Sequence, residues 1–123
     1  MAKNELLQGR WLRHLSNDDP LLLSAFAACR LFVLLSEKET QPISVLQAMA
    51  CNKPILLADA AYTIHSPFDA ATTVQLTPLS ALDTSIMKAW DSGLALSLSM
   101  EFTWPFVAKQ LVDIYESIIG SLR

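Results

Sequence analysis

Two short apolar runs, separated by a polar loop and a helical stretch, are the clearest pattern in the chain. Residues Leu31 to Leu35 are continuously apolar, and a second apolar run follows from Pro54 to Ala58. Strands without polar alternation are typical of a parallel sheet that helices cover on both faces. The pattern predicts a strand, a polar loop, a helix over about Pro42 to Cys51 and a second strand, with the first strand central in the sheet.

A further helix and strand are predicted before this segment. Asp19 followed by Pro20 is a helix start, because the aspartate oxygen satisfies an orphan amide and proline has no amide to leave unpaired. This helix is expected to run to about Cys29, and Arg10 to Leu15 is expected to form a strand. Asn52 tolerates the left-handed conformation that closes a helix, so the helix after the polar loop should end there.

The second half of the chain carries two more helical patterns. Thr73 to Leu76 predicts a short strand, and apolar residues at helical spacing predict a helix over Leu79 to Trp90. The segment Leu94 to Met100 fits either a strand or a helix. Thr103 then opens the last helix as a capping residue, and an apolar stripe predicts packing along its length. The stripe consists of Val107, Leu111, Ile114, Tyr115 and Ile118.

The sum of these elements is a single domain over residues 1–123 with an α/β fold. About four parallel strands alternate with helices, which predicts a three-layer, Rossmann-like sheet with helices on both faces and right-handed crossovers. In such open sheets, ligands bind beyond the carboxyl ends of the strands. The polar loop after the first apolar run is therefore the first place to look for a site.

Composition narrows the classes of partner. The chain is 52% hydrophobic and only 17% charged, so part of its apolar surface is expected to contact a partner protein or a further domain. A net charge of −3 with scattered Lys and Arg argues against nucleic-acid binding. Arg30 interrupts the longest apolar stretch, which excludes a membrane span there. Without the apolar core of a secretory signal at the start, a cytoplasmic location is expected.

The cysteines and histidines of the chain do not indicate a metal site or a reactive thiol. The two cysteines, Cys29 and Cys51, have no second cysteine or histidine at metal-ligand spacing and are expected to be reduced core thiols. His14 and His65 are two lone histidines, which do not build a metal site. No metal and no cofactor are expected.

The polar loop and the helix after it carry the candidate chemistry. Glu37 and Glu39 lie in the loop, and Gln47, separated from Glu39 by seven residues, lies on the helix that follows. Glu39 and Gln47 can therefore face one crevice. The free amides at a helix N-terminus carry about half an elementary positive charge, which suits a diphosphate.

The segment from Ser36 to Pro54 resembles the E-x(7)-E region of the group 1 retaining glycosyltransferases, which have the GT-B fold. The usual form in that family is S-x-x-E-G-x-G-x-x-x-x-E-A-M-A-x-G-x-P. With correct spacing throughout, the matching positions are Ser36, Glu39, Ala48, Met49, Ala50 and Pro54. The resemblance extends more loosely from Leu15 to Ile119. It implies half of a GT-B fold, the C-terminal half that binds the sugar donor, with the acceptor-binding N-terminal domain absent.

The resemblance also implies roles for individual residues. Glu39 would contact hydroxyls of the donor sugar as the catalytic residue, and Gln47 would hold the ribose of the nucleotide. The loop amides around Thr40, Gln41 and Ile43 would meet the sugar and the phosphates. A glycosyl group would then be transferred from a nucleotide-diphosphate sugar with retention. Amides and cations, rather than a required metal, would stabilise the departing diphosphate.

The chain also departs from the family pattern. Gln47 stands in place of the second glutamate, and a neutral amide is a weaker acceptor for ribose hydroxyls than a carboxylate. Thr40 and Pro42 replace glycines that allow close approach of the backbone, and Pro42 removes one amide donor. The loop from Asp59 to His65 has no glycine, where the family has a second glycine-bearing loop. Weak nucleotide binding and an inactive isolated domain are therefore expected.

Several alternatives stay open. The chain could be a non-catalytic α/β interaction domain that has lost the donor, or half of a related sugar epimerase. Glu39 could be a loop carboxylate that caps the next helix. Membrane contact is expected only peripherally, through the missing domain. The three tryptophans are expected to be core or domain-contact aromatics rather than sugar-stacking platforms, and they are Trp11, Trp90 and Trp104.

Overall fold

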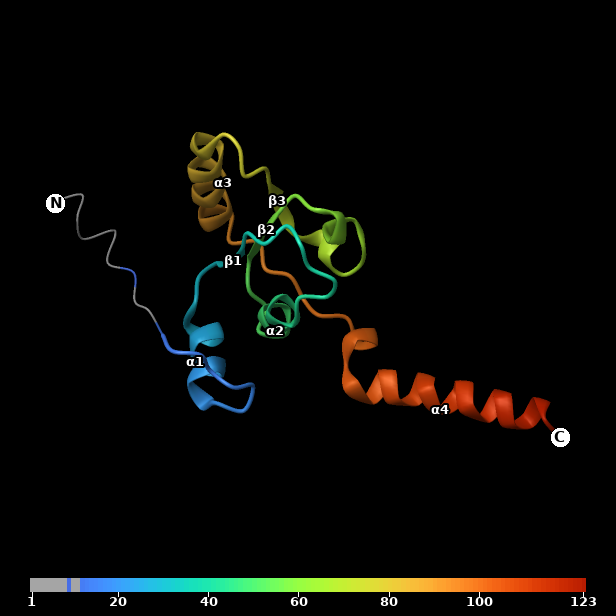
Figure 1. Ribbon diagram of the computed structural model, residues 1–123. Helices are drawn as coiled ribbons and strands as arrows, with labels where there is room; N and C mark the ends of the chain where they lie inside the picture. The colour runs from blue at the N-terminus through green and yellow to red at the C-terminus, as the bar shows by residue number, and fades with distance from the viewer. Residues whose placement is uncertain (1–8, 10–11) are drawn as a thin grey trace.

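A three-stranded parallel sheet lies at the centre of the molecule (Figure 1). The computed structural model describes Gly9 and residues 12–123. The strands are β1 (Phe32–Leu34), β2 (Ile55–Ala58) and β3 (Thr72–Val74), in the order β1-β2-β3. Both pairs of neighbours are parallel, which requires a crossover connection between each strand and the next.

The central strand is β2, and the prediction that the run Leu31 to Leu35 is central is wrong. All four residues of β2 are buried, whereas β1 lies at an edge and Val33 is 37% exposed. The fourth strand, expected over Arg10 to Leu15, is not present in its described part, because residues 12–15 have no strand pairing. Arg10 and Trp11 lie outside the described residues. Residues 12–15 do not pair with β1 as a strand. The apolar run at β1 is therefore less buried than the prediction of a central strand implied.

The first two helices begin and end close to the predicted positions. Helix α1 (Pro20–Ala28) starts with the predicted cap, in which the Asp19 carboxylate accepts a hydrogen bond from the Leu21 N–H at 2.9 Å. Helix α2 (Ile43–Ala50) is followed by Asn52 in the left-handed conformation, at φ +53°. This conformation confirms the prediction that Asn52 closes the helix. Asparagine was expected there because few other side chains accept a positive φ.

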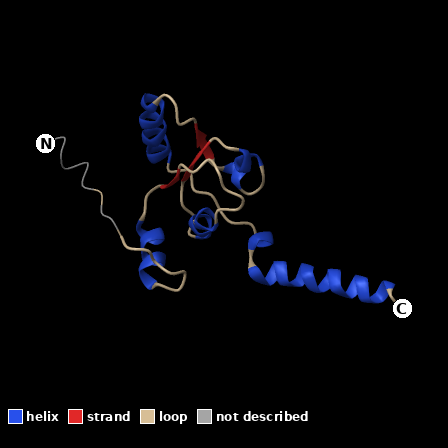
Figure 2. Ribbon diagram, in the orientation of Figure 1, coloured by secondary structure: helices blue, strands red, loops and turns tan. Residues whose placement is uncertain are grey.

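Helices cover both faces of the sheet, as predicted (Figures 1 and 2). On one face, α2 packs against Ile55 and Leu57 of β2. On the other face, α3 (Leu79–Ser92) places Ala89 against Leu56. Alternate residues of β2 thus point to opposite helical layers, which is the side-chain period of a strand. This three-layer arrangement confirms the α/β fold class, with three strands instead of about four, and is consistent with half of a GT-B fold.

The connections after β2 are mostly short helical turns. Two 3-10 helices, η1 (Ala61–Ile64) and η2 (Phe68–Ala70), lie between β2 and β3. Residues 94–99, where strand and helix were both possible, form neither, apart from an antiparallel bridge between Ala95 and Pro54. A third 3-10 helix, η3 (Met100–Phe102), leads into the last helix.

The last helix, α4 (Trp104–Ser121), extends away from the sheet and its two helical layers (Figure 1). It has no buried residue, and Leu111 and Ile118 are 47% and 51% exposed. The prediction that α4 packs along its length is therefore wrong for this structure, because the body of the domain offers its stripe no surface. Thr103 is the N-cap residue of α4, as predicted, but its hydroxyl donates to the Met100 carbonyl at 2.6 Å and caps no helix amide.

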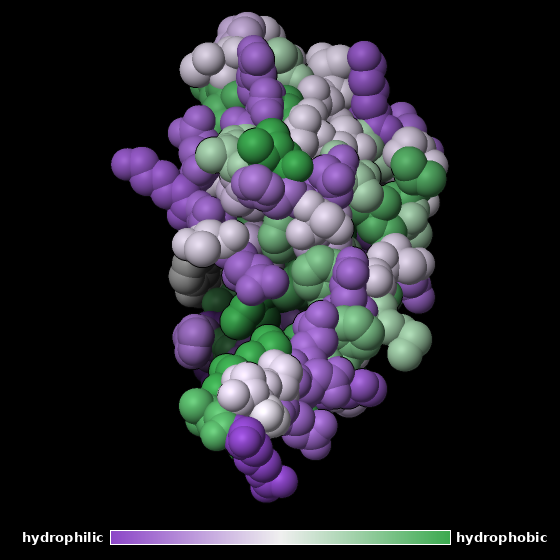
Figure 3. All heavy atoms as spheres, turned by 90° about the vertical axis from the view of Figure 1, so that its right-hand side faces the viewer, coloured by the Kyte–Doolittle hydropathy of each residue, from purple (hydrophilic) through white to green (hydrophobic). Residues whose placement is uncertain are grey.

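The exposed stripe gives this side of the molecule a mixed surface. Figure 3 views it from the side toward which α4 points, and hydrophobic side chains lie there between hydrophilic ones. None of the described helices combines the length and the hydropathy that a membrane-spanning helix requires.

Candidate functional site

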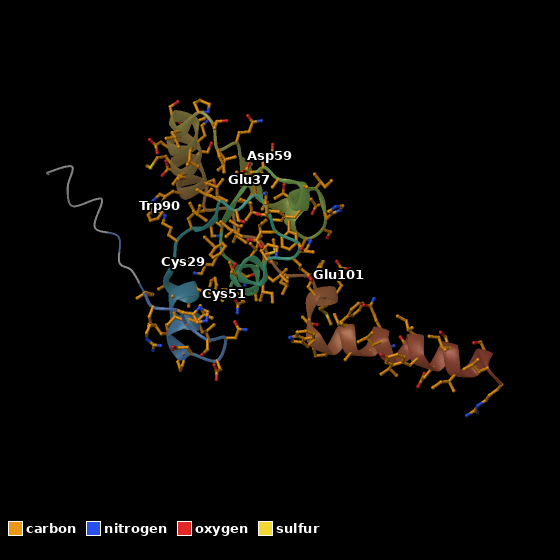
Figure 4. The ribbon with its side chains drawn as sticks, viewed as in Figure 1. Cys29, Glu37, Cys51, Asp59, Trp90 and Glu101 are labelled. Carbon is orange, nitrogen blue, oxygen red and sulfur yellow. The ribbon has the colours of Figure 1, made fainter. Side chains whose placement is uncertain are left out.

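The loops that follow β1 and β2 leave the sheet at the same edge. The two strands are parallel, with Leu34 opposite Leu57, so their carboxyl ends coincide. Figure 4 shows the consequence: Glu37, after β1, and Asp59, after β2, lie near one another at this edge. This is the edge at which open α/β sheets bind ligands.

Glu39 lies in the loop between β1 and α2, and its side chain is half-buried. The interpretation of Glu39 as a helix cap is wrong, because the N-cap residue of α2 is Pro42 and no side-chain hydrogen bond caps this helix. The first amides of a helix lack partners within it. The N-terminus of α2 therefore keeps donors that no side chain occupies, directly after the Glu39 loop.

A cavity of about 510 Å³ lies beside α2 and contains three of the predicted site residues. Gln41, Ile43 and Gln47 line it, whereas Glu39 and Thr40 do not. The structure thus brings together three of the five predicted site residues. It leaves Glu39 and Thr40 in the preceding loop, outside the cavity. The other lining residues are Asn17, Leu46, Ala50, Leu98, Glu101, Phe102, Trp104 and Val107.

Gln47 is half-buried and has a polar neighbour that the sequence pattern did not reveal. Its Nε2 donates to Oδ1 of Asn17 over a long distance of 3.4 Å. Asn17 lies just before α1, thirty residues away in the chain. The sequence near Asn17 predicts only that a helix starts at Asp19 and Pro20. It does not predict which other helix the loop before that start will contact.

The opposite wall of the cavity comes from the segment that leads into α4. Trp104 is 84% exposed, so it is not a core aromatic, and the alternative that it contacts a further domain stays a prediction. Trp90 is 41% exposed, and the Arg30 guanidinium lies 4.8 Å from the centre of its ring. Among the described residues that line the cavity, only Glu101 carries a formal charge. The cations that would stabilise a departing diphosphate are therefore not supplied by this lining.

A buried tyrosine lies in η1, the short helix that follows β2. Tyr62 of η1 is 4% exposed, and its ring packs edge-to-face on Phe68 with ring centres 5.7 Å apart. Burial, and then the negative charge of Glu39, raise the pKa of the Tyr62 hydroxyl. Both effects disfavour the phenolate, so Tyr62 is a neutral hydrogen-bond donor at physiological pH.

The two cysteines are free thiols and are half-buried rather than fully enclosed. Burial raises the pKa of Cys29, whose Sγ lies 3.2 Å from the Phe26 carbonyl oxygen. A raised pKa lowers the thiolate fraction and with it the reactivity. Across Gly9 and residues 12–123, no group of three or more potential metal ligands comes together.

A comparison with protein-family models identifies the family of this chain. The family model for group 1 glycosyl transferases matches residues 1–71, which is more than half of the 123 residues. The chain belongs to the group 1 glycosyltransferases. The match includes α1, β1, α2 and β2, and with them the whole segment from Ser36 to Pro54. Comparisons with curated proteins and with solved structures gave no significant match.

Membership of this glycosyltransferase family confirms the resemblance drawn from the segment Ser36 to Pro54. The family model ends at residue 71, so it does not test the looser resemblance that extends from there to Ile119. The roles of Glu39, Thr40, Gln41, Ile43 and Gln47 stay predictions. A glycosyltransferase domain with a cavity beside Gln47 is the basis for the proposal that follows.

Proposed function

We propose that this domain binds the nucleotide-diphosphate sugar donor of a glycosyl transfer that retains the anomeric configuration. The carrying observation is the cavity beside α2, because Gln41, Ile43 and Gln47 converge on it within a group 1 glycosyltransferase domain. Gln47 would hold the ribose, and Glu39 in the neighbouring loop would receive hydroxyls of the sugar. The amides of Thr40, Gln41 and Ile43 would contact the sugar and the phosphates. No metal and no cofactor take part in the proposed transfer.

The isolated chain is proposed to be inactive as a hexosyltransferase. The described residues of the cavity lining include no lysine or arginine, so from these residues the charge of a departing diphosphate would meet amides only. A separate acceptor-binding domain or a partner protein would bind the acceptor and supply the missing cations. The enzyme would act in the cytoplasm and contact membranes only peripherally. No nucleic acid is proposed as a partner.

Calorimetric titration of nucleoside diphosphates and their sugars into the protein tests donor binding. Gln47→Glu should bind a nucleoside diphosphate about three to ten times more tightly than the unsubstituted protein, because a carboxylate accepts ribose hydroxyls more strongly than an amide. The Asn17 amide can turn its NH₂ group toward the new carboxylate, so the local contact is kept.

Gln110→Glu on α4 is the matched control, because it adds the same charge at an exposed position. It should leave the affinity unchanged. Absence of heat with every nucleotide, for both the unsubstituted protein and Gln47→Glu with the fold intact, would argue against a donor site.

The competing proposal is a non-catalytic interaction domain. It is favoured by the buried Pro42 at the start of α2, which removes one amide donor where the phosphates would lie. In that case Gln47→Glu should change nothing, and the same titration separates the two functions.

A further inference from the structure

The hydroxyl of Tyr62 is buried and has no hydrogen-bond partner in the described part of the chain. The side chain is 4% exposed, and its ring packs edge-to-face on Phe68. Nearly all buried polar groups in proteins have a partner, because an unpaired one loses its hydrogen bonds to water without compensation. The unpaired Tyr62 hydroxyl therefore indicates a partner that approaches it in the working state.

Topology makes Glu39 the candidate for that partner. Leu34 of β1 is the register partner of Leu57 of β2, and Glu39 and Tyr62 each lie five residues beyond this pair. The two loops leave the sheet at the same edge, where Figure 4 shows Glu37 and Asp59 near one another. The charge of Glu39 also acts on the Tyr62 hydroxyl, since it contributes to the raised pKa of that group.

The chemistry of the two side chains is complementary. A neutral phenol donates one hydrogen bond, and a carboxylate accepts up to about four. Glu39 is half-buried in the loop before α2, and a contact between the two side chains requires a rotamer of Glu39 that brings a carboxylate oxygen to the tyrosine. One oxygen would then be held by the protein, while the other stays free for a ligand.

We propose that Tyr62 is a positioning residue for Glu39, whose hydroxyl donates to the Glu39 carboxylate and orients it to receive hydroxyls of the donor sugar. This inference rests on the proposed donor function. The loop from Asp59 to His65 lacks the expected glycine, and it contributes this tyrosine hydroxyl instead. A hydrogen bond to a charged acceptor is both stronger and more directional than one between neutral groups.

The contact is testable without any ligand. The chain has two tyrosines, and Tyr115 is 61% exposed, so Tyr115→Phe leaves Tyr62 as the only phenol to titrate. In that background, Glu39→Gln should lower the pKa of Tyr62 in an absorbance titration, because the carboxylate that favours the neutral phenol is gone. Glu37→Gln, at an exposed position of the same loop, should lower it less. An unchanged pKa in Glu39→Gln, or an equal decrease in Glu37→Gln, would overturn the contact.

Ligand binding tests the positioning role. Tyr62→Phe keeps the ring and should weaken binding of a nucleotide-diphosphate sugar about fivefold, with no change for the nucleoside diphosphate alone. In a Glu39→Gln background, Tyr62→Phe should have no further effect, because the two residues act as one unit. Tyr115→Phe is the control and should match the unsubstituted protein in both titrations.

The outcomes separate this inference from the proposed function. If the unsubstituted protein binds no nucleotide sugar, the donor function fails and the positioning role fails with it. If it binds but Tyr62→Phe binds equally well, only the positioning role is overturned. Equal weakening for the sugar nucleotide and the nucleoside diphosphate would also overturn it, since that result indicates a general structural defect.

Discussion

At the scale of single residues, the turn after α2 depends on Asn52. This residue has φ +53°, and its Oδ1 accepts a hydrogen bond from the Ser97 hydroxyl at 3.0 Å. A side chain with a Cβ atom normally avoids this conformation, and asparagine is one of the few that accept it. Asn52 therefore both closes the helix and ties it to the segment that leads toward η3.

We expect Asn52→Ala to lower the free energy of unfolding by about 1–2 kcal/mol, through backbone strain and the lost hydrogen bond. Asn52→Gly should cost less, because glycine has no Cβ to strain. Ser97→Ala removes the hydrogen bond alone and serves as the control. Urea denaturation followed by circular dichroism measures all three. The prediction fails if Asn52→Ala and Asn52→Gly unfold at the same urea concentration.

At the scale of secondary-structure elements, α2 and α4 differ in what their apolar residues contact. Helix α2 buries Val45 and Met49 completely or almost so, at 0% and 1% exposure. Helix α4 is more than twice as long and buries no residue. Length and apolar content therefore do not decide which helix stabilises this domain.

Truncation of one side chain on each helix should show the contrast. Met49→Ala should reduce the free energy of unfolding by about 2–5 kcal/mol, because it leaves a cavity in the core. Ile118→Ala, on the exposed stripe of α4, should change it by less than about 0.5 kcal/mol. Thermal and urea unfolding measure both variants. A cost for Ile118→Ala close to that of Met49→Ala would mean that the stripe is packed in solution.

At the scale of the whole molecule, the sheet and its two helical layers form the stable body, and α4 lies outside it (Figure 1). The two core clusters meet across β2, whose four residues are all buried. Local opening is easiest where few apolar contacts must be broken. Stability should therefore be distributed unevenly along the chain.

Hydrogen exchange should show this distribution directly. Amides of β2 and α2 should exchange most slowly, near the rate set by global unfolding, whereas amides of α4 should exchange much faster. The measurement is exchange followed by mass spectrometry of peptides, with α3 as an internal reference because it is helical and contacts the sheet. Protection of α4 equal to that of α2 would contradict the arrangement seen here.

The segment from Asp19 to Ala58 was predicted well because its signals are local. Asp19 caps α1, the two apolar runs form β1 and β2, and Asn52 closes α2, as their individual conformational preferences require. The same segment carries the glycosyltransferase pattern from Ser36 to Pro54. Two of the errors concern position in space, since β1 is at the edge and the stripe of α4 has no cover.

The candidate site divides in the same way. The family resemblance implied roles for Gln41, Ile43 and Gln47; these three residues line one cavity, and their roles stay predictions. Asn17 and Trp104 were missed as lining residues, because each reaches the cavity from an element far away in sequence. Spacing along one helix is readable from the chain, whereas the walls that other elements contribute are not.

The sequence by itself determined the α/β class, the helix starts and stops, and the family, because these rest on side-chain preferences and spacings within short segments. Only the tertiary structure decided that β2 is central, that α4 stands apart, and that the Tyr62 hydroxyl is buried without a hydrogen-bond partner among the described residues. These features depend on which distant surfaces meet, and the free energy of such contacts is not encoded in any one segment.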